Sequence, residues 1–498
     1  MHRNLSVAAL YEHALRNGEG ALGADGQLVV DTGAHTARSP GDKFVVREPS
    51  TGTLVDWGES NRPIDAAAFD ALLERARAYL SGRDTYVVDA YAGAGPGDRV
   101  TLRLTTDLAW HALFARNLFS ARDLRFGDGL EPDLTVVDAA GFEADPARDG
   151  TSSGTFVLLD LGRRIVLIGG TRFAGELKKS IFTVLNYLLP LRGVLPMHCA
   201  ANVGPAGETA LFFGSSGAGK TTLSANAGRH LLGDDEHAWS SCGVANLEAG
   251  CYAGVAELSR ASAAEIWDAS HRFGAVLENV VYDPHSRELD PADTSRTDNA
   301  RASYSVREIP GSLPGALTDH PRAVVFLVPD AFGVLPPVAR LTHSQAVDHF
   351  LYGYAGEFDS GGAPVATFSA CFGAAFLVHR PERYAKLFAE RIAEHRVECW
   401  LVNTGWGGEP RGAGRRTPIE FTRRLIAAAL DGEFAVCEYE IDPFFGLARP
   451  RGTPCMPGEL LDPRATWPDA AAYAAQATIL ATLLRERGAA LATVPLLQ

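Results

Sequence analysis

The stretch Glu208-Thr-Ala-Leu-Phe-Phe-Gly-Ser-Ser-Gly-Ala-Gly-Lys-Thr-Thr-Leu-Ser224 is the most informative part of the chain. Its apolar first part predicts a strand, its glycine-rich middle predicts a loop, and its end predicts the start of a helix. Gly214, Gly219, Lys220 and Thr221 fit the spacing G-x-x-x-x-G-K-[ST] of a phosphate-binding loop. An ordinary glycine-rich turn is the alternative, but the strand before the loop and the helix after it favour phosphate binding.

The chemistry of this loop follows from its residue types. Glycines let several backbone N–H groups turn toward one anion, and the N-terminus of the following helix adds positive potential. Lys220 has the reach to contact the outer phosphates of a nucleotide, and Thr221 offers a hydroxyl to Mg²⁺. The positions expected to bind the nucleotide phosphates are Gly214, Ser215, Ser216, Gly217, Ala218, Gly219, Lys220, Thr221 and Thr222.

Two adjacent acids, Asp234 and Asp235, end an apolar strand predicted shortly after the loop. Hard divalent cations prefer oxygen ligands, so carboxylates near a nucleotide phosphate site are typical metal ligands. A solvated turn, or an N-cap pair for a following helix, is the alternative. The phosphate loop upstream favours metal binding.

The length and charge of the chain limit its architecture and its partners. With 498 residues it exceeds the roughly 250–300 residues that one core usually supports, so two domains are expected. A formal net charge of −14 argues against non-specific binding to nucleic acid or to anionic membranes. It leaves room for a locally basic pocket. We therefore expect small-molecule substrates, no nucleic acid, no membrane and a monomer.

Targeting and redox features indicate a cytoplasmic protein. The chain has 7 cysteines without a C-x-x-C pair, which indicates neither a disulfide framework nor a zinc site. Residues 1–10 lack a long apolar segment and Glu12 follows closely, so no signal peptide is expected. The nearest apolar run, 368–378, is shorter than the roughly 18 residues needed to span a bilayer.

Hydrophobic periodicity predicts an α/β chain without internal repeats. Helices are predicted at 5–16, 65–81, 109–119, from the 169–179 region to about 188, and at 381–394, 422–431 and 470–487. Strands are predicted at 28–31, 44–47, 85–91, 99–104, 134–138, 155–161, 164–169, 229–237, 323–328 and 399–402. The run 368–378 fits a helix or a strand. Pro190 and Pro196 are expected to break the chain, which places a domain boundary near Gly193.

Several further candidates say little one at a time. Lys178 and Lys179 follow a glycine-rich turn, but most lysines are solvated surface residues. His198 lies among apolar residues, where a histidine is more often a satisfied core residue than a ligand. Arg301 and Glu278 are likewise ordinary when taken alone.

Taken together, these segments resemble the ATP-dependent phosphoenolpyruvate carboxykinase family. The resemblance extends from about Asp31 to about Arg464 and keeps one order along the chain. The segments that carry it are Thr36–Lys43, Tyr86–Ala92, Gly169–Lys179, Met197–Gly204, Phe212–Ser224, Gly233–His237, Leu277–Val280, Ala331–Thr342, Thr367–Leu377 and Leu401–Trp406.

The resemblance implies a two-lobed α/β fold whose C-terminal mononucleotide-binding domain contains the phosphate loop. Residues 1–193 would form the substrate-side domain, and residues 194–498 the nucleotide- and metal-binding domain, with the active site in the cleft. The implied reaction is reversible: oxaloacetate loses CO₂, and the enolate oxygen takes the γ-phosphoryl group of ATP to give phosphoenolpyruvate and ADP, a step of gluconeogenesis.

The resemblance also implies two metal sites. Lys179, His198 and Asp235 match the positions that bind Mn²⁺ at the reacting centre, where it stabilises the enolate. Thr221 and Asp234 match the positions that hold Mg²⁺ at the nucleotide. A lysine ligates a metal only when it is neutral, so this site would have to lower the lysine pKa by burial and by the charge of the metal.

Other side chains are matched to roles at the phosphates and the base. Lys178 and Arg301 match cations that, with Lys220, contact the transferring phosphoryl group. Glu278 matches an acid near the phosphates. On the adenine side the matched residues are Arg416 and Thr422.

The departures from the family pattern lie on the substrate side. Arg38 matches the arginine that binds the substrate carboxylate, but Ala37 beside it replaces a usual glycine, and Gly41 replaces a usual lysine. Phe173 stands where the family usually has a substrate-side tyrosine, which removes one placed hydrogen bond worth roughly 0.5–1.5 kcal/mol. The segment 356–362 is acidic and shorter than the family's basic active-site lid.

Three functions therefore remain open at this point. The first is an ATP-dependent phosphoenolpyruvate carboxykinase. The second is a divergent member of the family that phosphorylates or decarboxylates another small carboxylate or phosphonate. The third is a nucleotide-binding protein without turnover, which Lys179, His198 and Asp235 disfavour because a sensor needs no second metal.

Overall fold

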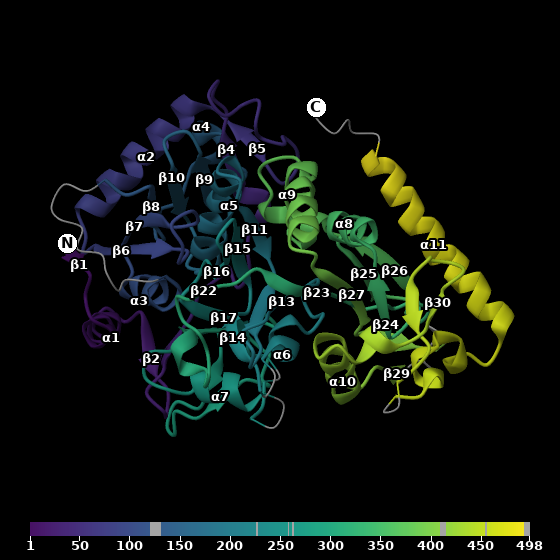
Figure 1. Cartoon of the computed structure of the whole chain (residues 1–498). Helices are drawn as coiled ribbons and strands as arrows, with labels where there is room; N and C mark the ends of the chain where they lie inside the picture. The colour runs from purple at the N-terminus through teal and green to yellow at the C-terminus, as the bar shows by residue number, and fades with distance from the viewer. Residues whose placement is uncertain are drawn as a thin grey trace. The chain divides into compact units, whose positions relative to one another are not determined.

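The chain folds into two compact units that each contain helices and sheets, which confirms the predicted α/β class (Figure 1). The computed structural model describes residues 1–119, 131–225, 228–256, 258–260, 263–408, 415–453 and 456–492. Unit 1 comprises 1–196, 245–317 and 375–380, and unit 2 comprises 197–244, 318–374 and 381–498. The chain thus first changes unit next to the predicted boundary at 193/194, and later returns twice to unit 1.

Unit 1 is built on an eight-stranded sheet of order β1-β6-β7-β8-β10-β9-β4-β5. Strand β7 alternates buried and half-buried residues, as expected when one face of a strand packs on a core. Helix α2 buries Phe69, Leu72 and Leu73 in one cluster with Val137 and Phe156 of the sheet. The strands are β1 (His2–Arg3), β4 (Lys43–Val46), β5 (Arg62–Ile64), β6 (Tyr86–Ala92), β7 (Val100–Thr106), β8 (Leu134–Ala139), β9 (Phe156–Asp160) and β10 (Ile165–Gly169).

The helices of unit 1 are α1 (Val7–Arg16), α2 (Ala66–Ser81), α3 (Ala109–Leu118), α4 (Pro146–Asp149), α5 (Gly175–Leu191) and α7 (Ala264–Ser270). Four of them, α1, α2, α3 and α5, were predicted from the sequence, whereas α4 and α7 were not. One expectation was wrong, because α5 does not stop before Pro190. The helix includes Pro190 and ends at Leu191, and Gly193 just beyond it has a φ of +69° that turns the chain away. Pro196 lies within β11 (Leu195–His198).

A second sheet explains why residues 245–317 belong to unit 1. Its order is β17-β21-β18-β3-β2, so strands from that segment pair with strands near the N-terminus. β3 and β18 are parallel with Val30 opposite Glu278, and β18 and β21 are antiparallel with Glu278 opposite Arg301. The strands are β2 (Gly20–Leu22), β3 (Leu28–Val30), β17 (Gly250–Gly254), β18 (Val276–Glu278) and β21 (Arg301–Ser305).

Unit 2 has an eight-stranded sheet of order β14-β12-β13-β23-β27-β24-β31-β30. Its strands β13, β23 and β27 are parallel neighbours, so their carboxyl ends share one edge. The strands are β12 (Ala200–Val203), β13 (Thr209–Phe213), β14 (His230–Gly233), β23 (Pro321–Val328), β24 (Val338–Leu341), β27 (Glu398–Asn403), β30 (Tyr439–Ile441) and β31 (Ala448–Pro450). The helices are α6 (Lys220–Ser224), α8 (His343–Tyr352), α9 (Pro381–Glu394), α10 (Ile419–Leu430) and α11 (Ala470–Ala492).

The apolar run 368–378 is neither a helix nor a strand. It forms two short 3₁₀ turns, Ala370–Phe372 and Ala374–Phe376, separated by Gly373. Cys371 and Phe372 have positive φ values of 53° and 56°, a backbone conformation that interrupts both regular structures. Apolar composition alone therefore did not reveal this turn.

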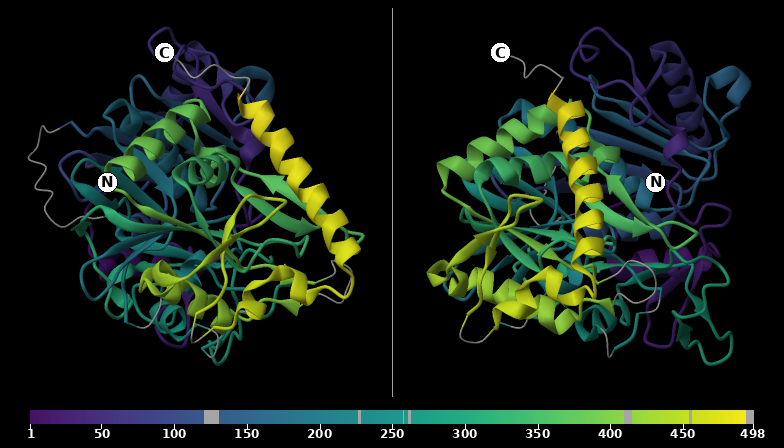
Figure 2. Two further views of the ribbon diagram at one scale, coloured as in Figure 1. Left: turned by 45° about the vertical axis from the view of Figure 1, so that its right-hand side comes forward. Right: turned by 90° about the vertical axis from the view of Figure 1, so that its right-hand side faces the viewer.

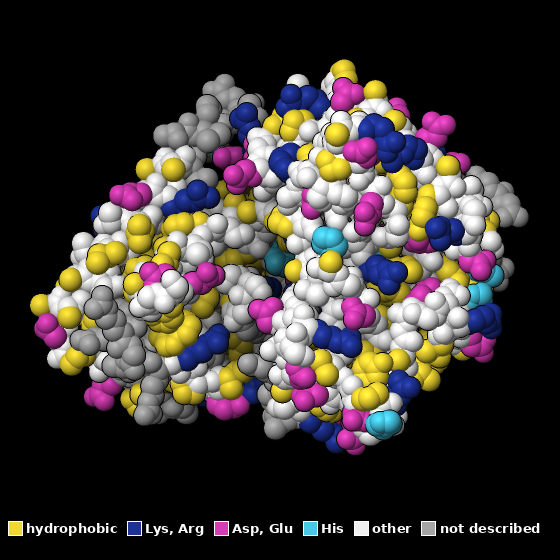
Figure 3. Space-filling model, turned by 180° about the vertical axis from the view of Figure 1, so that it is seen from behind, with side chains coloured by type: hydrophobic (Ala, Val, Ile, Leu, Met, Phe, Trp, Pro, Cys, Tyr) yellow, Lys and Arg dark blue, Asp and Glu magenta, His cyan; other side chains and the backbone are white. Residues whose placement is uncertain are grey.

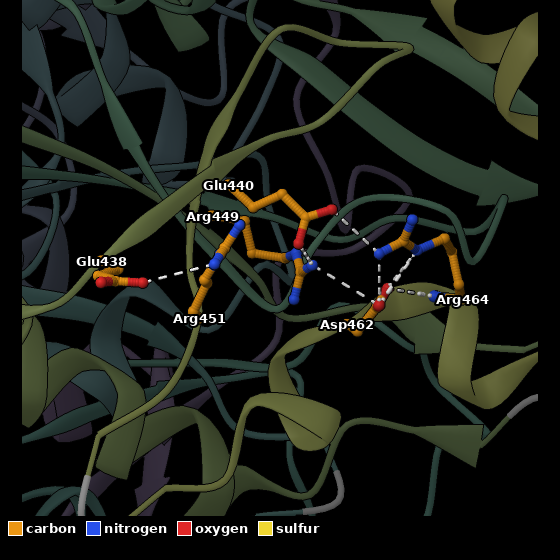
Figure 4. Close-up of polar contacts among 6 residues, drawn as sticks. All are labelled: Glu438, Glu440, Arg449, Arg451, Asp462 and Arg464. Atoms are coloured by element: carbon orange, nitrogen blue, oxygen red, sulfur yellow. Dashed lines mark hydrogen bonds and ion pairs between the residues drawn. The ribbon is translucent and has the colours of Figure 1, made fainter.

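The C-terminal part of unit 2 is tied together by ion pairs (Figure 4). Arg449 on β31 contacts Glu440 at 2.8 Å and Asp462 at 3.6 Å, and Arg464 contacts Asp462 at 2.7 Å. Arg451 pairs with Glu438 at 3.4 Å, one residue beyond the paired ends of β31 and β30. These contacts hold the segment that leads into α11, which Figure 2 shows as one long helix.

The surface carries side chains of both charges. Figure 3 shows Lys and Arg side chains interspersed with Asp and Glu side chains on the face that it presents. Over the residues described above, no helix combines the length and apolarity needed to cross a bilayer.

Candidate active site

The predicted phosphate loop connects β13 to α6 in unit 2. Gly217 and Gly219 have φ values of +77° and +94°, which side chains with a Cβ rarely adopt. A Cβ at Gly214 would lie 2.8 Å from the carbonyl oxygen of Leu327, so only glycine fits there. Ser216 and Gly217 are exposed at the tip of the loop. The loop therefore presents backbone to solvent at the place where a ligand phosphate is expected.

Lys220 begins helix α6 and folds back over this loop. Its Nζ donates hydrogen bonds to the carbonyl oxygens of Gly214 at 2.8 Å and Ser215 at 3.1 Å. Thr221 and Thr222 follow it and are half-buried. The ammonium group thus lies against the loop, as expected for a cation that neutralises phosphate oxygens.

Loops after the two neighbouring parallel strands reach the same edge of the sheet. Asp330, fully buried after β23, accepts hydrogen bonds from the backbone N–H groups of Phe332, Val334 and Leu335, each at 2.8 Å. Burial nevertheless raises its pKa above the ordinary value. Asn403, the last residue of β27, accepts from the N–H of Gly405 at 2.8 Å. Sequence reasoning missed both residues, although each directly follows a buried apolar run.

Arg416 links the phosphate loop to this edge. It donates to the carbonyl oxygen of Gly217 at 3.0 Å, and its guanidinium lies 5.5 Å from the ring centre of Trp406. The ring of Trp406 also packs in a T-shaped arrangement with Phe358, with 4.9 Å between the ring centres. Thr422, the second predicted adenine contact, is buried in α10. A flat aromatic surface beside the loop is a suitable place for a nucleobase.

The segment predicted to be a short acidic lid is a regular hairpin. Strands β25 (Tyr354–Phe358) and β26 (Pro364–Phe368) pair antiparallel over their full length. At its tip, Asp359 accepts hydrogen bonds from the N–H groups of Gly361 at 2.9 Å and Ala363 at 2.8 Å. The acid thus stabilises the turn.

His198 and Asp235 come together in unit 2. The Nε2 atom of His198 lies 2.7 Å from the Oδ1 atom of Asp235, and its Nδ1 lies 2.8 Å from the carbonyl oxygen of Phe372. A carbonyl only accepts, so Nδ1 carries a hydrogen and Nε2 faces the carboxylate. Two acceptors this close need a proton or a metal cation between them. Asp234, next to Asp235, is buried.

Across the described ranges, no group of three or more His, Cys, Asp or Glu side chains is arranged to hold a metal. His198 and Asp235 are the two predicted metal ligands that lie close together within unit 2.

Lys178 and Lys179 lie in the first turns of α5 in unit 1 and differ in their surroundings. The Lys178 side chain is only 1% exposed, and its Nζ lies 3.0 Å from Glu248. Lys179 is half-buried, and its Nζ lies 4.8 Å and 5.8 Å from the ring centres of Phe376 and Phe182. Both distances are within the range at which an aromatic ring attracts a cation.

Arg38 shares the Phe376 ring with Lys179. Its guanidinium lies 4.9 Å from the centre of that ring, and its Nε lies 3.7 Å from Glu176. Lys43 lies nearby, and burial together with the charge of Arg38 lowers its pKa to about 8. The structure thus gathers the predicted substrate arginine and metal lysine around one aromatic ring.

The departures from the family pattern differ in their structural consequences. Phe173 is 3% exposed and its ring covers Gly175, where a Cβ would lie 2.4 Å from the ring. It also lies 6.3 Å from the ring of Tyr252. A Cβ at Gly41 would meet no atom within 4 Å, so the missing lysine leaves open space there.

Glu278 and Arg301 face each other on adjacent strands of unit 1. Arg301 lies 5.1 Å from the ring centre of Tyr252 and donates to Asn299 at 3.0 Å. Glu278 is 1% exposed, and burial raises its pKa from 4.5 to about 7. Burial and the neighbouring Glu278 also raise the pKa of Tyr252. Glu278 is therefore largely a neutral acid below pH 7.

Replacing Glu278 with glutamine is expected to stabilise the protein at high pH. The folded state keeps the Glu278 proton between pH 4.5 and about 7, where the unfolded chain has lost it, so the free energy of unfolding falls as pH rises through this window. The loss amounts to about 3 kcal/mol and is complete above the folded pKa. Denaturant unfolding measures the free energy of unfolding of Glu278→Gln relative to the wild type. This difference should be about 3 kcal/mol larger at pH 8 than at pH 4.5.

The matched control for this prediction is Glu288→Gln, which changes an exposed glutamate of the same unit. Its stability difference from the wild type should stay constant between the two pH values. The same constant difference for Glu278→Gln would show that Glu278 is ionised throughout.

Comparisons with known proteins place these features in context. A family model described as "Phosphoenolpyruvate carboxykinase" matches residues 1–459. The chain is 50% identical over 499 aligned positions to "Phosphoenolpyruvate carboxykinase (ATP) 2" of Moorella thermoacetica, covering 99% of this chain and 95% of the relative. It is 48% identical over 485 positions to "Phosphoenolpyruvate carboxykinase (ATP)" of Geotalea uraniireducens, covering 96% and 92%. It is 50% identical over 486 positions to the protein of that name from Methylobacterium nodulans, covering 97% and 90%.

Proposed function

This chain belongs to the ATP-dependent phosphoenolpyruvate carboxykinase family, and on that premise we propose that it converts oxaloacetate and ATP to phosphoenolpyruvate, ADP and CO₂. The observation that carries the proposal is about 50% identity to curated ATP-dependent enzymes along nearly the whole chain. The enzyme is thus a carboxy-lyase that also transfers a phosphoryl group. We place this activity in the cytoplasm, in gluconeogenesis.

The phosphate loop and its neighbours would bind ATP. Backbone N–H groups of 214–222 would surround the phosphates, with the Lys220 ammonium on the outer oxygens. Arg416, already bound to the Gly217 carbonyl, would lie between the phosphates and the base, with Thr422 on the adenine side. This arrangement explains why Arg416 and Trp406 lie together at the carboxyl ends of the parallel strands.

Two metal ions fit the donor atoms that the chain offers. His198, Asp235 and Lys179 would hold Mn²⁺ through imidazole, carboxylate and amine, and the Asp235 carboxylate is the type of oxygen ligand that suits this metal. Thr221 and Asp234 would hold Mg²⁺. The bound cation at the first site supplies Lewis acidity to the enolate oxygen. The hydrogen bond from Nδ1 of His198 to the Phe372 carbonyl orients the imidazole for this role.

The remaining charged side chains would act on the substrates directly. Arg38 would bind a carboxylate of oxaloacetate through its planar fork. Lys178, Lys220 and Arg301 would neutralise charge on the transferring phosphoryl group, whose transition state spreads negative charge over its oxygens. Glu278, opposite Arg301, would set the position of that guanidinium near the phosphates.

One assay tests this proposal. The purified protein is incubated with ATP, Mn²⁺, Mg²⁺ and oxaloacetate, and phosphoenolpyruvate and ADP are measured together. Equal formation of both products is the expected result. ADP formation only with a different small carboxylate or phosphonate would show a divergent activity, and ATP binding without any turnover would show a nucleotide-binding protein.

A substitution at the buried Phe173 tests how well the pocket fits oxaloacetate. Phe173→Tyr restores a phenol at a position where the family usually has one, and a placed hydrogen bond is worth roughly 0.5–1.5 kcal/mol. We expect kcat/KM for oxaloacetate to rise about 2- to 10-fold. Phe142→Tyr, at a partly buried phenylalanine of the same unit, is the control and should leave kcat/KM unchanged. No gain with Phe173→Tyr would indicate a pocket adapted to another acid.

A further inference from the structure

A buried ion pair holds the first turns of α5. The Nζ atom of Lys178 lies 3.0 Å from both carboxylate oxygens of Glu248 and donates a hydrogen bond to Oε2. The two side chains are only 1% and 3% exposed. In such surroundings neither charge has water as an alternative partner, so each determines where the other lies.

The backbone around Glu248 is fixed on both sides. The N–H of Ala249 donates to the carbonyl oxygen of Leu118 at 2.7 Å, and the N–H of Val306 donates to the carbonyl oxygen of Ala249 at 3.1 Å. A Cβ at Gly250 would lie 2.1 Å from the carbonyl oxygen of Asn117, so the backbone at Gly250 packs too closely against α3 for any side chain to fit. Glu248 therefore projects from a segment that cannot shift without breaking several contacts.

The N–H of Glu248 adds a further anchor. It donates to the side-chain oxygen of Asn246 at 2.9 Å, and Asn246 itself is buried. Nothing in the amino-acid sequence around Glu248 resembles a catalytic motif, although its carboxylate forms an ion pair with Lys178. Its position is nevertheless over-determined, as expected for a residue that orients another.

We propose that Glu248 is a positioning residue, which fixes Lys178 and through it the orientation of the first turns of α5. The inference rests on the proposed function, because Lys178 is there a cation at the phosphoryl group. Successive residues of a helix point about 100° apart, so anchoring Lys178 also sets the direction of Lys179. Without the carboxylate, the ammonium would leave its buried place, and the helix would lose a rotational constraint.

The test is a double-mutant cycle on the full-length enzyme. We expect Glu248→Gln to lower kcat about 30-fold with little change in KM for ATP, because small misplacements of catalytic groups cost up to roughly 100-fold. We expect Lys178→Met to lower kcat at least as much. If Glu248 acts only through Lys178, the double variant should have the kcat of Lys178→Met within about threefold. Multiplied losses in the double variant would overturn the proposal.

Asp149→Asn is the matched control for a merely structural effect. Asp149 is a buried acid of the same unit that pairs with Arg75 at 2.6 Å, far from any site residue in sequence. Both acid variants should unfold at lower denaturant concentration than the wild type, but only Glu248→Gln should lose kcat in native conditions. Equal kcat values for Glu248→Gln and the wild type would refute the inference, whereas a wild type that makes no phosphoenolpyruvate would refute the proposed function instead.

Discussion

His198→Gln is expected to lower kcat/KM for oxaloacetate by about a thousandfold, because it removes an imidazole ligand of the proposed Mn²⁺ site. The structure supplies two reasons for the size of this effect. Nε2 of His198 lies 2.7 Å from Asp235, so the pair is already arranged to share one cation. The Phe372 carbonyl accepts a hydrogen bond from Nδ1 of His198, which keeps the hydrogen on Nδ1 and leaves Nε2 as the nitrogen that faces the metal site. Steady-state kinetics at saturating ATP measure the effect.

Manganese binding should change together with the kinetics of this variant. The electron paramagnetic resonance signal of free Mn²⁺ reports how much metal the protein binds, and His198→Gln should bind much less than the wild type. His320→Gln is the control, since His320 accepts a hydrogen bond from Trp239 within the same unit and is not a candidate ligand. Unchanged Mn²⁺ binding in His198→Gln would remove His198 from the proposed metal site.

The second large effect is expected at the phosphate loop. Lys220→Met should lower kcat with ATP by roughly 100- to 1,000-fold, because no other side chain of the loop carries a positive charge to the transferring phosphoryl group. KM for ATP should rise less, since backbone N–H groups supply much of the ground-state binding. Initial rates over a range of ATP concentrations separate the two effects.

The control for this variant is Lys386→Met, which removes an exposed lysine of α9. Its kcat should match that of the wild type. If Lys220→Met bound ATP weakly but kept a normal kcat at saturation, Lys220 would be a binding residue without a role in the chemical step.

Local signals along the chain were sufficient to predict much of the fold. The helix predicted at 65–81 appears as α2 (Ala66–Ser81), with the Asp65 side chain accepting the N–H of Ala67 as a cap. The strands predicted at 155–161 and 164–169 are present as β9 and β10, which pair antiparallel. These elements depend on neighbours in sequence, through periodicity, caps and turns, and such information is visible in a single chain.

Features that depend on distant residues were not visible in the same way. The pairing of Glu248 with Lys178 joins positions on different elements, and neither acid nor lysine is distinctive in its own segment. The hydrogen bonds that Asp330 accepts from the following loop could not be predicted either, because an aspartate after a strand is common. The role of each is determined by burial, which only the packed structure reveals.

The roles of individual site residues came from resemblance rather than from pattern. Within each unit the structure brings together His198 with Asp235, Arg38 with Lys179, and Glu278 with Arg301. Phosphate binding at 214–222 is the exception, because the glycine spacing followed by Lys220 predicts this function without any resemblance to a family.

The interleaved course of the chain limits how this enzyme can be divided. In the five-stranded sheet, three strands (β17, β18 and β21) come from 245–317, whereas β2 and β3 come from the N-terminal part. A recombinant fragment stopping at 196 would leave β3 with an unpaired edge, inviting aggregation. Domain exchange between relatives would therefore need to transplant both stretches at once, and a cut at a single point would produce two pieces that must complement each other to fold.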